Sequence, residues 1–191
     1  MSTTTTPNLA EAERRAATLG LLGFDVDGTL TDGRIYIGPT GEAMKAFSVR
    51  DGFGLNLLRR AGIRIAIVTA RESAIVALRA AELGFDAVIQ GARDKAATMR
   101  ELGERFGVPM AHCGFVGDDW PDLAAMTQAG FRATVAGAPA EIRARAHWVS
   151  TLAPGAGAVR ELAEFVLRAK GQWDELLLSF GAPPAPGSRS P

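Results

Sequence analysis

The amino-acid sequence predicts an α/β protein: a single Rossmann-like, doubly wound parallel sheet with helices on both faces and a β-hairpin after the first strand. Short apolar or β-branched runs alternate along the chain with longer helical patterns, which is typical of right-handed βαβ crossovers. A Gly-Pro-Thr-Gly turn between two short polar-apolar segments interrupts that alternation once. The 191 residues suffice for one domain with a substantial core and are too few for two ordinary domains.

The expected elements follow in order from the apolar pattern. A tail and a short helix at residues 1–20 precede a domain at residues 21–170, and residues 171–191 form a C-terminal tail whose Pro- and Gly-rich end is expected to be disordered. Strands are expected at 21–26, 63–68, 87–89, 115–116 and 132–135, with hairpin strands at 34–37 and 43–47. Helices are expected at 9–19, 52–60, 73–82, 95–106, 122–127, 140–145 and 158–170.

Composition excludes several classes of function. Lys plus Arg number 21 and Asp plus Glu number 21, so the formal net charge of +0 gives no electrostatic reason to bind nucleic acid or a membrane surface. A single cysteine, Cys113, cannot form an internal disulfide or a thiolate zinc cluster, so any metal should be held by oxygen. Neither a targeting segment nor a long apolar run is evident, and we expect a cytoplasmic protein.

Two carboxylates follow the first expected strand. The sequence Leu-Leu-Gly-Phe-Asp-Val-Asp-Gly-Thr places Asp25 and Asp27 two residues apart, where side chains of a strand point to the same side. Carboxyl ends of parallel strands form the ligand-binding edge of such sheets. Neighbouring carboxylates repel, which favours a shared proton or a bound divalent cation. Taken alone, the segment also fits a turn with two solvated acids.

Polar residues follow two further expected strands. Thr69 comes after the second strand, and the fourth strand leads into Asp118, Asp119 and Asp122. Lys95 opens a helix between them. Taken singly, Thr69 is an ordinary residue at a strand end and Lys95 an ordinary solvated lysine. Together they predict one site at the carboxyl edge of the sheet.

This ordered set resembles the haloacid dehalogenase superfamily of phosphotransferases, whose four motifs stand here as the Asp-Val-Asp-Gly-Thr segment, Thr69, Lys95 and the Gly-Asp-Asp segment. Four motifs in order, over nearly all of residues 21–170, are far more specific than any one. The resemblance implies a phosphatase in which Asp25 attacks phosphorus and Asp27 serves as general acid and base. Thr69 and Lys95 would stabilise charge on the transferred phosphoryl group.

The resemblance also implies Mg²⁺, a cation that prefers oxygen ligands. The metal would relieve repulsion between nucleophile and phosphate. Its ligands are expected to be the carboxylates of Asp25 and Asp118 and the main-chain carbonyl of Asp27. Asp119 and Asp122 are expected to support these ligands or to act through water.

The motif spacing leaves no room for a cap domain. Positions 27 and 69 are 42 apart, positions 95 and 118 are 23 apart, and superfamily members that close over their substrate insert a cap in one of these intervals. With the segments at 47–52, 90–91 and 157–161, this capless pattern is similar to the 3-deoxy-D-manno-octulosonate 8-phosphate phosphatases. Because those enzymes are tetramers in which a neighbour completes the site, the resemblance implies a homotetramer.

The same resemblance places Asp32, Gly33, Arg50 and Arg71 around a small sugar-acid phosphate. That substrate carries a carboxylate besides its phosphate and needs a cation to bind it. For either arginine, the alternative is a surface residue paired with a local acid.

Two alanines, Ala70 and Ala156, depart from the pattern of the octulosonate enzymes. A nine-carbon sugar acid 9-phosphate, or another small phosphate ester, is therefore an alternative substrate. A noncatalytic assembly module with the same fold is a third hypothesis, and the retained acids and lysine argue against it.

Overall fold

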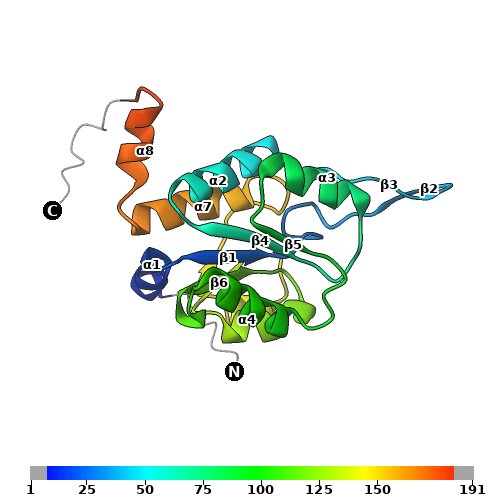
Figure 1. Ribbon diagram of the computed structural model, residues 1–191, viewed down its shortest axis with the longest axis horizontal. Helices are drawn as coiled ribbons and strands as arrows, with labels where there is room; N and C mark the ends of the chain where they lie inside the picture. Colours follow the sequence, from blue (N-terminus) through cyan, green and yellow to red (C-terminus); the bar gives the residue numbers. More distant parts are fainter. Residues whose placement is uncertain (1–7, 183–191) are drawn as a thin grey trace.

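The computed structural model describes residues 8–182, and it confirms the predicted fold class. Six parallel strands form one sheet in the order β5-β4-β1-β6-β7-β8, and β2 pairs antiparallel with β3 in a separate hairpin (Figure 1). The sheet strands are β1 (Leu21–Phe24), β4 (Arg64–Val68), β5 (Ala87–Ile89), β6 (Cys113–Val116), β7 (Phe131–Thr134) and β8 (Trp148–Val149). The hairpin strands are β2 (Tyr36–Gly38) and β3 (Gly41–Met44).

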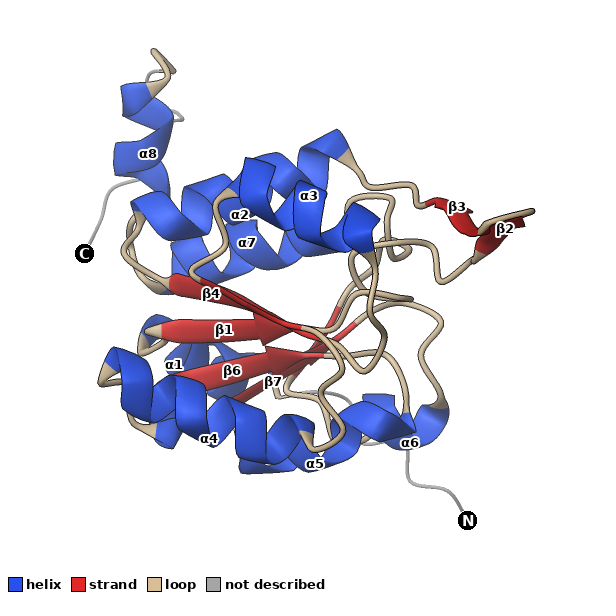
Figure 2. Ribbon diagram, turned by 45° about the vertical axis from the view of Figure 1, so that its right-hand side comes forward, coloured by secondary structure: helices blue, strands red, loops and turns tan. Residues whose placement is uncertain are grey.

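Helices cover both faces of the sheet (Figure 2). One face carries α2 (Val49–Arg60), α3 (Ala74–Leu83) and α7 (Ala158–Ala169). The other carries α4 (Lys95–Phe106), α5 (Leu123–Gln128) and α6 (Ala140–Arg143). The remaining helices are α1 (Leu9–Ala17), which packs beside α7, α8 (Trp173–Ser179), and the 3-10 turns η1 (Met110–His112) and η2 (Trp120–Asp122).

The side chains of the central strands belong to two apolar clusters, one on each face of the sheet. In β1, Leu22 and Phe24 join the cluster that includes residues of α2 and α7, whereas Leu21 joins the cluster that includes residues of α4 and α5. Because both faces are covered, β1 is apolar and buried at every position. This buried sheet holds the carboxyl ends of β4, β1 and β6 side by side, where the predicted motifs lie.

Side-chain caps set where the helices begin. The Ser48 hydroxyl accepts a hydrogen bond from the N–H of Asp51 at 3.3 Å, so α2 begins three residues earlier than expected. The Asp94 carboxylate accepts from the N–H of Ala97 at 2.9 Å. Lys95 is therefore the first residue of α4, as the sequence predicts, and its position against the sheet edge is fixed by a capped helix.

The hairpin is tighter than the sequence predicts. Gly38 pairs directly with Gly41, so the turn is made by Pro39 and Thr40 alone, and the strands form at 36–38 and 41–44. Gly41 has φ +116°, a conformation that glycine adopts without a steric penalty. Lys45 consequently stands just beyond the end of β3, at the base of the hairpin.

The segment after α7 is helical where the sequence predicts a tail. Trp173 and Leu176 of α8 are partly buried against the core, and the Arg168 guanidinium lies 4.4 Å from the centre of the Trp173 ring. These contacts supply the apolar burial that a short helix needs. Of the expected disordered end, residues 183–191 lie outside the described residues. Within residues 8–182, the helices are too short or too polar to cross a membrane.

Candidate active site

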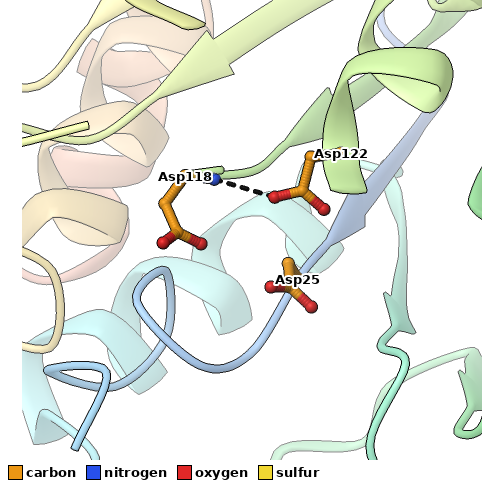
Figure 3. Close-up of side chains that lie close together, drawn as sticks. All are labelled: Asp25, Asp118 and Asp122. Carbon is orange, nitrogen blue, oxygen red and sulfur yellow. Dashed lines mark hydrogen bonds between the residues drawn. The ribbon is translucent and has the colours of Figure 1, made fainter. Parts of the chain in front are cut away.

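Three acidic side chains converge at the carboxyl edge of the sheet (Figure 3). Asp25 follows β1, while Asp118 and Asp122 follow the neighbouring strand β6. One carboxylate oxygen from each of the three lies within 4.8 Å of the others. Two motifs that are far apart in the sequence are thus brought together, because β1 and β6 are paired in parallel.

Lys95 contacts two of these carboxylates. Its Nζ lies 2.8 Å from Oδ1 of Asp25 and 2.6 Å from Oδ1 of Asp122, and its side chain is 4% exposed. Burial alone would lower the pKa of Lys95, but the charges and hydrogen bonds of Asp25 and Asp122 outweigh burial, and the pKa is raised. The lysine is therefore a fixed cation at neutral pH.

The acids carry more negative charge than Lys95 balances. Burial, and after it the charges of Asp122 and Asp25, raise the pKa of Asp118 to about 7. Burial and the charge of Asp122 also raise the pKa of Asp25, although Lys95 opposes them. A divalent cation held between Asp25 and Asp118 would remove this repulsion, and oxygen donors of this kind are those that Mg²⁺ prefers.

Asp122 acts as a support for the other charged groups. Its Oδ2 accepts hydrogen bonds from the N–H groups of Asp118, at 2.9 Å, and Asp119, at 3.2 Å, while its Oδ1 accepts from Lys95. With both oxygens engaged and the side chain 1% exposed, Asp122 fixes the loop and the lysine. Asp25 and Asp118 are left as the carboxylates available to a metal.

Asp119 has a different environment. Its side chain accepts from the N–H of Trp120 at 2.8 Å and, with Asp122, forms the capping box of η2. Asp119 does not belong to the group of three acids within 4.8 Å of one another, as far as the described residues show. Its contacts are those of a local cap.

Two glycines permit the close approach of these acids. A Cβ on Gly28, which has φ +91°, would lie 2.2 Å from Oδ2 of Asp118. A Cβ on Gly117 would lie 2.4 Å from the side chain of Asp122. Any side chain at either position would displace an acid of the cluster.

We expected Asp25 and Asp27 to lie on one strand with their side chains on the same side, but neither residue belongs to a strand. Strand β1 ends at Phe24, so both acids belong to the loop that follows, where the alternation of a strand no longer applies. Asp25 contacts Lys95, whereas Asp27 forms an ion pair with Lys45 and lies 3.4 Å from Nε of Arg71.

Sequence reasoning missed the charged residues at the base of the hairpin. Lys45 also lies 2.9 Å from Oε1 of Glu42, and the Ser73 hydroxyl donates to the other oxygen of Glu42. The hydrogen bond from Ser73, and the nearby cations Lys45 and Arg71 after it, keep the pKa of Glu42 low despite desolvation. Two opposite charges three residues apart in a short hairpin next to the first motif were the available signal.

Thr69 occupies the expected place at the end of β4. It is 3% exposed, its N–H donates to the carbonyl of Ile89 at 3.0 Å, and its carbonyl accepts from the N–H of Ala92 at 2.9 Å. Because β4 pairs with β1, Thr69 lies at the same sheet edge as Asp25. Arg71 follows two residues later, with its side chain 48% exposed.

The remaining predicted residues lie around a loop at 152–157. A Cβ on Gly155 would lie 2.8 Å from the backbone N of Asp32, and a Cβ on Gly157 would lie 4.0 Å from the guanidinium of Arg50. Asp32 itself accepts from the N–H of Arg34 at 3.1 Å, which makes it a local turn residue as well. Gly33 has φ +78°, and a Cβ there would lie 3.4 Å from Cα of Gly28.

Buried Asp51 joins this loop to α2. Its carboxylate accepts from the N–H of Gly157 at 3.2 Å and of Arg160 at 2.8 Å, at the start of α7. Burial raises the pKa of Asp51, and those backbone hydrogen bonds oppose the effect. The Asp51 carboxylate therefore fixes the end of the loop at 152–157, which lies beside Arg50.

A doubly wound sheet whose carboxyl edge presents Asp25, Lys95 and Asp118 defines a phosphotransferase of the haloacid dehalogenase type. Residues 48–130 accordingly match the model of the haloacid dehalogenase-like hydrolases. The chain belongs to the 3-deoxy-D-manno-octulosonate 8-phosphate phosphatases within that group, and it is a phosphatase.

Two curated relatives carry this assignment. The chain is 38% identical over 169 residues to the 3-deoxy-D-manno-octulosonate 8-phosphate phosphatase of Escherichia coli (strain B / BL21-DE3), covering 88% of this chain and 90% of the relative. It is 39% identical over 161 residues to the phosphatase of the same name from Salmonella typhi, covering 84% and 86%.

Solved structures agree with the sequence relatives. The phosphatase from Moraxella catarrhalis, crystallised with a magnesium ion, a phosphate ion and a KDO molecule, matches with a TM-score of 0.86 at 40% identity, over 89% of this chain and 98% of that chain. The phosphatase from Yersinia pestis matches with a TM-score of 0.83 at 37% identity, over 85% and 88%.

Proposed function

We propose that this phosphatase hydrolyses 3-deoxy-D-manno-octulosonate 8-phosphate to the free sugar acid and phosphate, with Mg²⁺ as cofactor. The observation that carries the proposal is the cluster of Asp25, Asp118 and buried Lys95, in which the acids carry more negative charge than the lysine balances. The relatives named above indicate which substrate to propose, because they are similar to this chain in sequence over most of its length.

In the first step, a carboxylate oxygen of Asp25 forms a bond to phosphorus while the bond from phosphorus to the sugar oxygen breaks. Asp27 gives its proton to the departing oxygen. In the second step, Asp27 takes a proton from water, the water oxygen bonds to phosphorus, and phosphate leaves Asp25. Dividing the hydrolysis through an aspartyl phosphate replaces one difficult displacement by two easier ones.

The surrounding residues hold charge in place during both steps. Lys95, 2.8 Å from Asp25, orients the attacking carboxylate and offsets charge on the phosphoryl oxygens, with Thr69 as a further hydrogen-bond donor. The carboxylates of Asp25 and Asp118 and the main-chain carbonyl of Asp27 would hold the metal. When bound, Mg²⁺ supplies electrostatic stabilisation of the transferring phosphoryl group.

Substrate selection is assigned to Arg71 and Arg50, with Asp32 and Gly33. Arg71 supports this assignment best, because it is half-exposed and lies 3.4 Å from Asp27, next to where the leaving group departs. A guanidinium there can pair with the carboxylate of a sugar acid.

The test is phosphate release from a panel of phosphate esters, with Mg²⁺ or with excess chelator. We expect kcat/KM to be highest for octulosonate 8-phosphate, and Arg71→Ala to lower that value more than the value for an aryl phosphate. Equal kcat/KM for octulosonate 8-phosphate and glucose 6-phosphate would refute the substrate. Undiminished turnover in chelator would refute the cofactor.

We also propose that the enzyme is a homotetramer that works in the cytoplasm. The hairpin exposes apolar side chains that a second copy could cover, with Ile37 79% exposed and Met44 58% exposed. A two-stranded hairpin of this kind is marginal without such packing. Light scattering that found an active monomer at micromolar concentration would contradict the tetramer, and recovery of the enzyme outside the cytoplasmic fraction would contradict the location.

A further inference from the structure

Lys45 at the base of the hairpin is nearly buried, although no part of the mechanism above uses it. Its side chain is 1% exposed, compared with 48% for Arg71 close by. A buried ammonium group is costly unless it is paired, so its partners determine its position. Those partners are Oδ1 of Asp27 and Oε1 of Glu42.

Glu42 is itself anchored. The hydroxyl of Ser73, which caps α3, donates to one of its oxygens, and Nη2 of Arg71 lies 3.8 Å from the other. The contacts therefore run from the start of α3 through Glu42 and Lys45 to Asp27. They connect the hairpin base to the loop that carries the proposed acid and base.

The pairing divides the two oxygens of Asp27. Lys45 occupies Oδ1, and Oδ2 lies 3.4 Å from Arg71 on the exposed side of the site. Oδ2 is thus the oxygen that can carry the proton and give it to a leaving group. Asp27 stands in a loop beyond β1, and within the described residues Lys45 is the only donor that makes a hydrogen bond to its carboxylate.

Glu42 keeps Lys45 paired with an anion whether the Asp27 carboxylate is charged or neutral. When Asp27 is neutral, Lys45 keeps an anionic partner 2.9 Å away and is not left as an unpaired buried cation. Its N–H can still donate to Oδ1 while Oδ2 bears the proton. The same geometry therefore serves Asp27 both as acid and as base.

We propose that Lys45 is a positioning residue that orients the Asp27 carboxylate for proton transfer to the leaving oxygen. This inference rests on the proposed role of Asp27. It makes the hairpin base part of the catalytic apparatus of its own subunit, separately from any contact that the hairpin makes with another copy.

The test compares two aryl phosphates of similar shape, phenyl phosphate and 4-nitrophenyl phosphate. Phenolate is the poorer leaving group and depends more on an acid. Because kcat/KM reports the steps up to phosphoryl transfer, Lys45→Met should lower kcat/KM by about 10- to 100-fold for phenyl phosphate and by much less for the nitrophenyl ester. Lys45→Arg, which keeps a cation, should restore most of the loss.

Controls separate positioning from general damage. Arg34→Met removes a cation that lies just before β2 and is 77% exposed, and it should leave the ratio between the two esters unchanged. Glu42→Gln, which keeps the side-chain shape, should shift the ratio in the same direction as Lys45→Met and by less. It provides the test if Lys45→Met does not fold.

The outcomes separate the two proposals. Equal losses for both esters in Lys45→Met and an unchanged ratio in Glu42→Gln would refute the positioning role. A rise in KM with unchanged kcat would also refute it, because that pattern indicates a substrate contact. Failure of the unmodified enzyme to hydrolyse either ester in Mg²⁺ would instead refute the proposed function.

Discussion

Each edge of the sheet brings like charges close together: negative charges at the carboxyl edge and positive charges at the amino edge. At the carboxyl edge, Asp25, Asp118 and Asp122 surround one lysine, and burial with mutual repulsion raises the pKa of Asp118 to about 7. At the amino edge, burial and then the charges of Arg132 and Arg15 lower the pKa of His147 to about 4. Crowded like charges therefore do not by themselves mark a reactive site.

The difference lies in what each charged group already contacts. At the amino edge, Arg15 donates to the carbonyl of Gly130 at 2.8 Å, and Nη2 of the Arg132 guanidinium lies 2.6 Å from Nε2 of His147. Both arginine side chains therefore already contact other groups of the protein. At the carboxyl edge, Asp25 and Asp118 point oxygens at a shared space (Figure 3), which is the arrangement that binds a cation.

Removing the nucleophile should have the largest effect. Asp25→Asn keeps the size of the side chain but removes the charged oxygen that attacks phosphorus, so we expect turnover to fall by at least about 1000-fold. Phosphate release measures the loss, and circular dichroism checks that the fold is retained. Substantial remaining turnover would contradict the covalent mechanism.

A smaller effect is expected from Asp118→Asn, which tests whether the clustered carboxylates at the carboxyl edge bind a metal. In chelator at pH 8, the free energy of unfolding of the variant should be about 1–2 kcal/mol higher than that of the unmodified protein. The reason is that the substitution removes a partly buried charge that its neighbours repel. Added Mg²⁺ should raise the melting temperature of the unmodified protein and not that of the variant. Asp119→Asn, at a cap where Asn serves as well as Asp, should retain the Mg²⁺ effect.

The smallest effect concerns the amino edge. Between pH about 6.5 and about 4, the unfolded chain protonates His147 while the folded chain does not, so this group makes stability fall as pH falls. Asp118 acts oppositely in metal-free protein: the folded state holds the extra proton, and stability falls as pH rises towards 7. We expect His147→Gln to lose less of its urea midpoint than the unmodified protein between pH 7.5 and pH 5. Identical losses would show that His147 is not the group responsible.

Much of the fold and part of the site could be predicted because the relevant signals are local. The segment at 87–89 and the helix at 95–106 form as expected, since apolar runs and a cap at Asp94 define them. The meeting of Asp25 with Asp118 follows from the rule that parallel strands end at one edge. β8, with two residues, is too short to leave a periodic signal.

What could not be predicted depends on where the chain bends. Asp25 and Asp27 contact different cations beyond the end of β1 at Phe24, a boundary that the apolar pattern does not mark. Lys45 reaches Asp27 only through the fold of the hairpin, and no spacing along the sequence encodes that contact. The packing of Trp173 and Leu176 of α8 against the core is a long-range contact that the sequence pattern does not mark.

The hydrogen bonds of Asp51 have a consequence for the order in which the protein assembles. They join groups 106 and 109 positions apart in the chain, and β1 needs β6, more than ninety positions later, as its second neighbour. Contacts of such long range slow folding, because the entropy of closing a long loop must be lost before they form. On the ribosome, α7 emerges last among the elements that Asp51 ties together. The loop beside Arg50 should therefore be the final part of the pocket to take shape in the nascent chain.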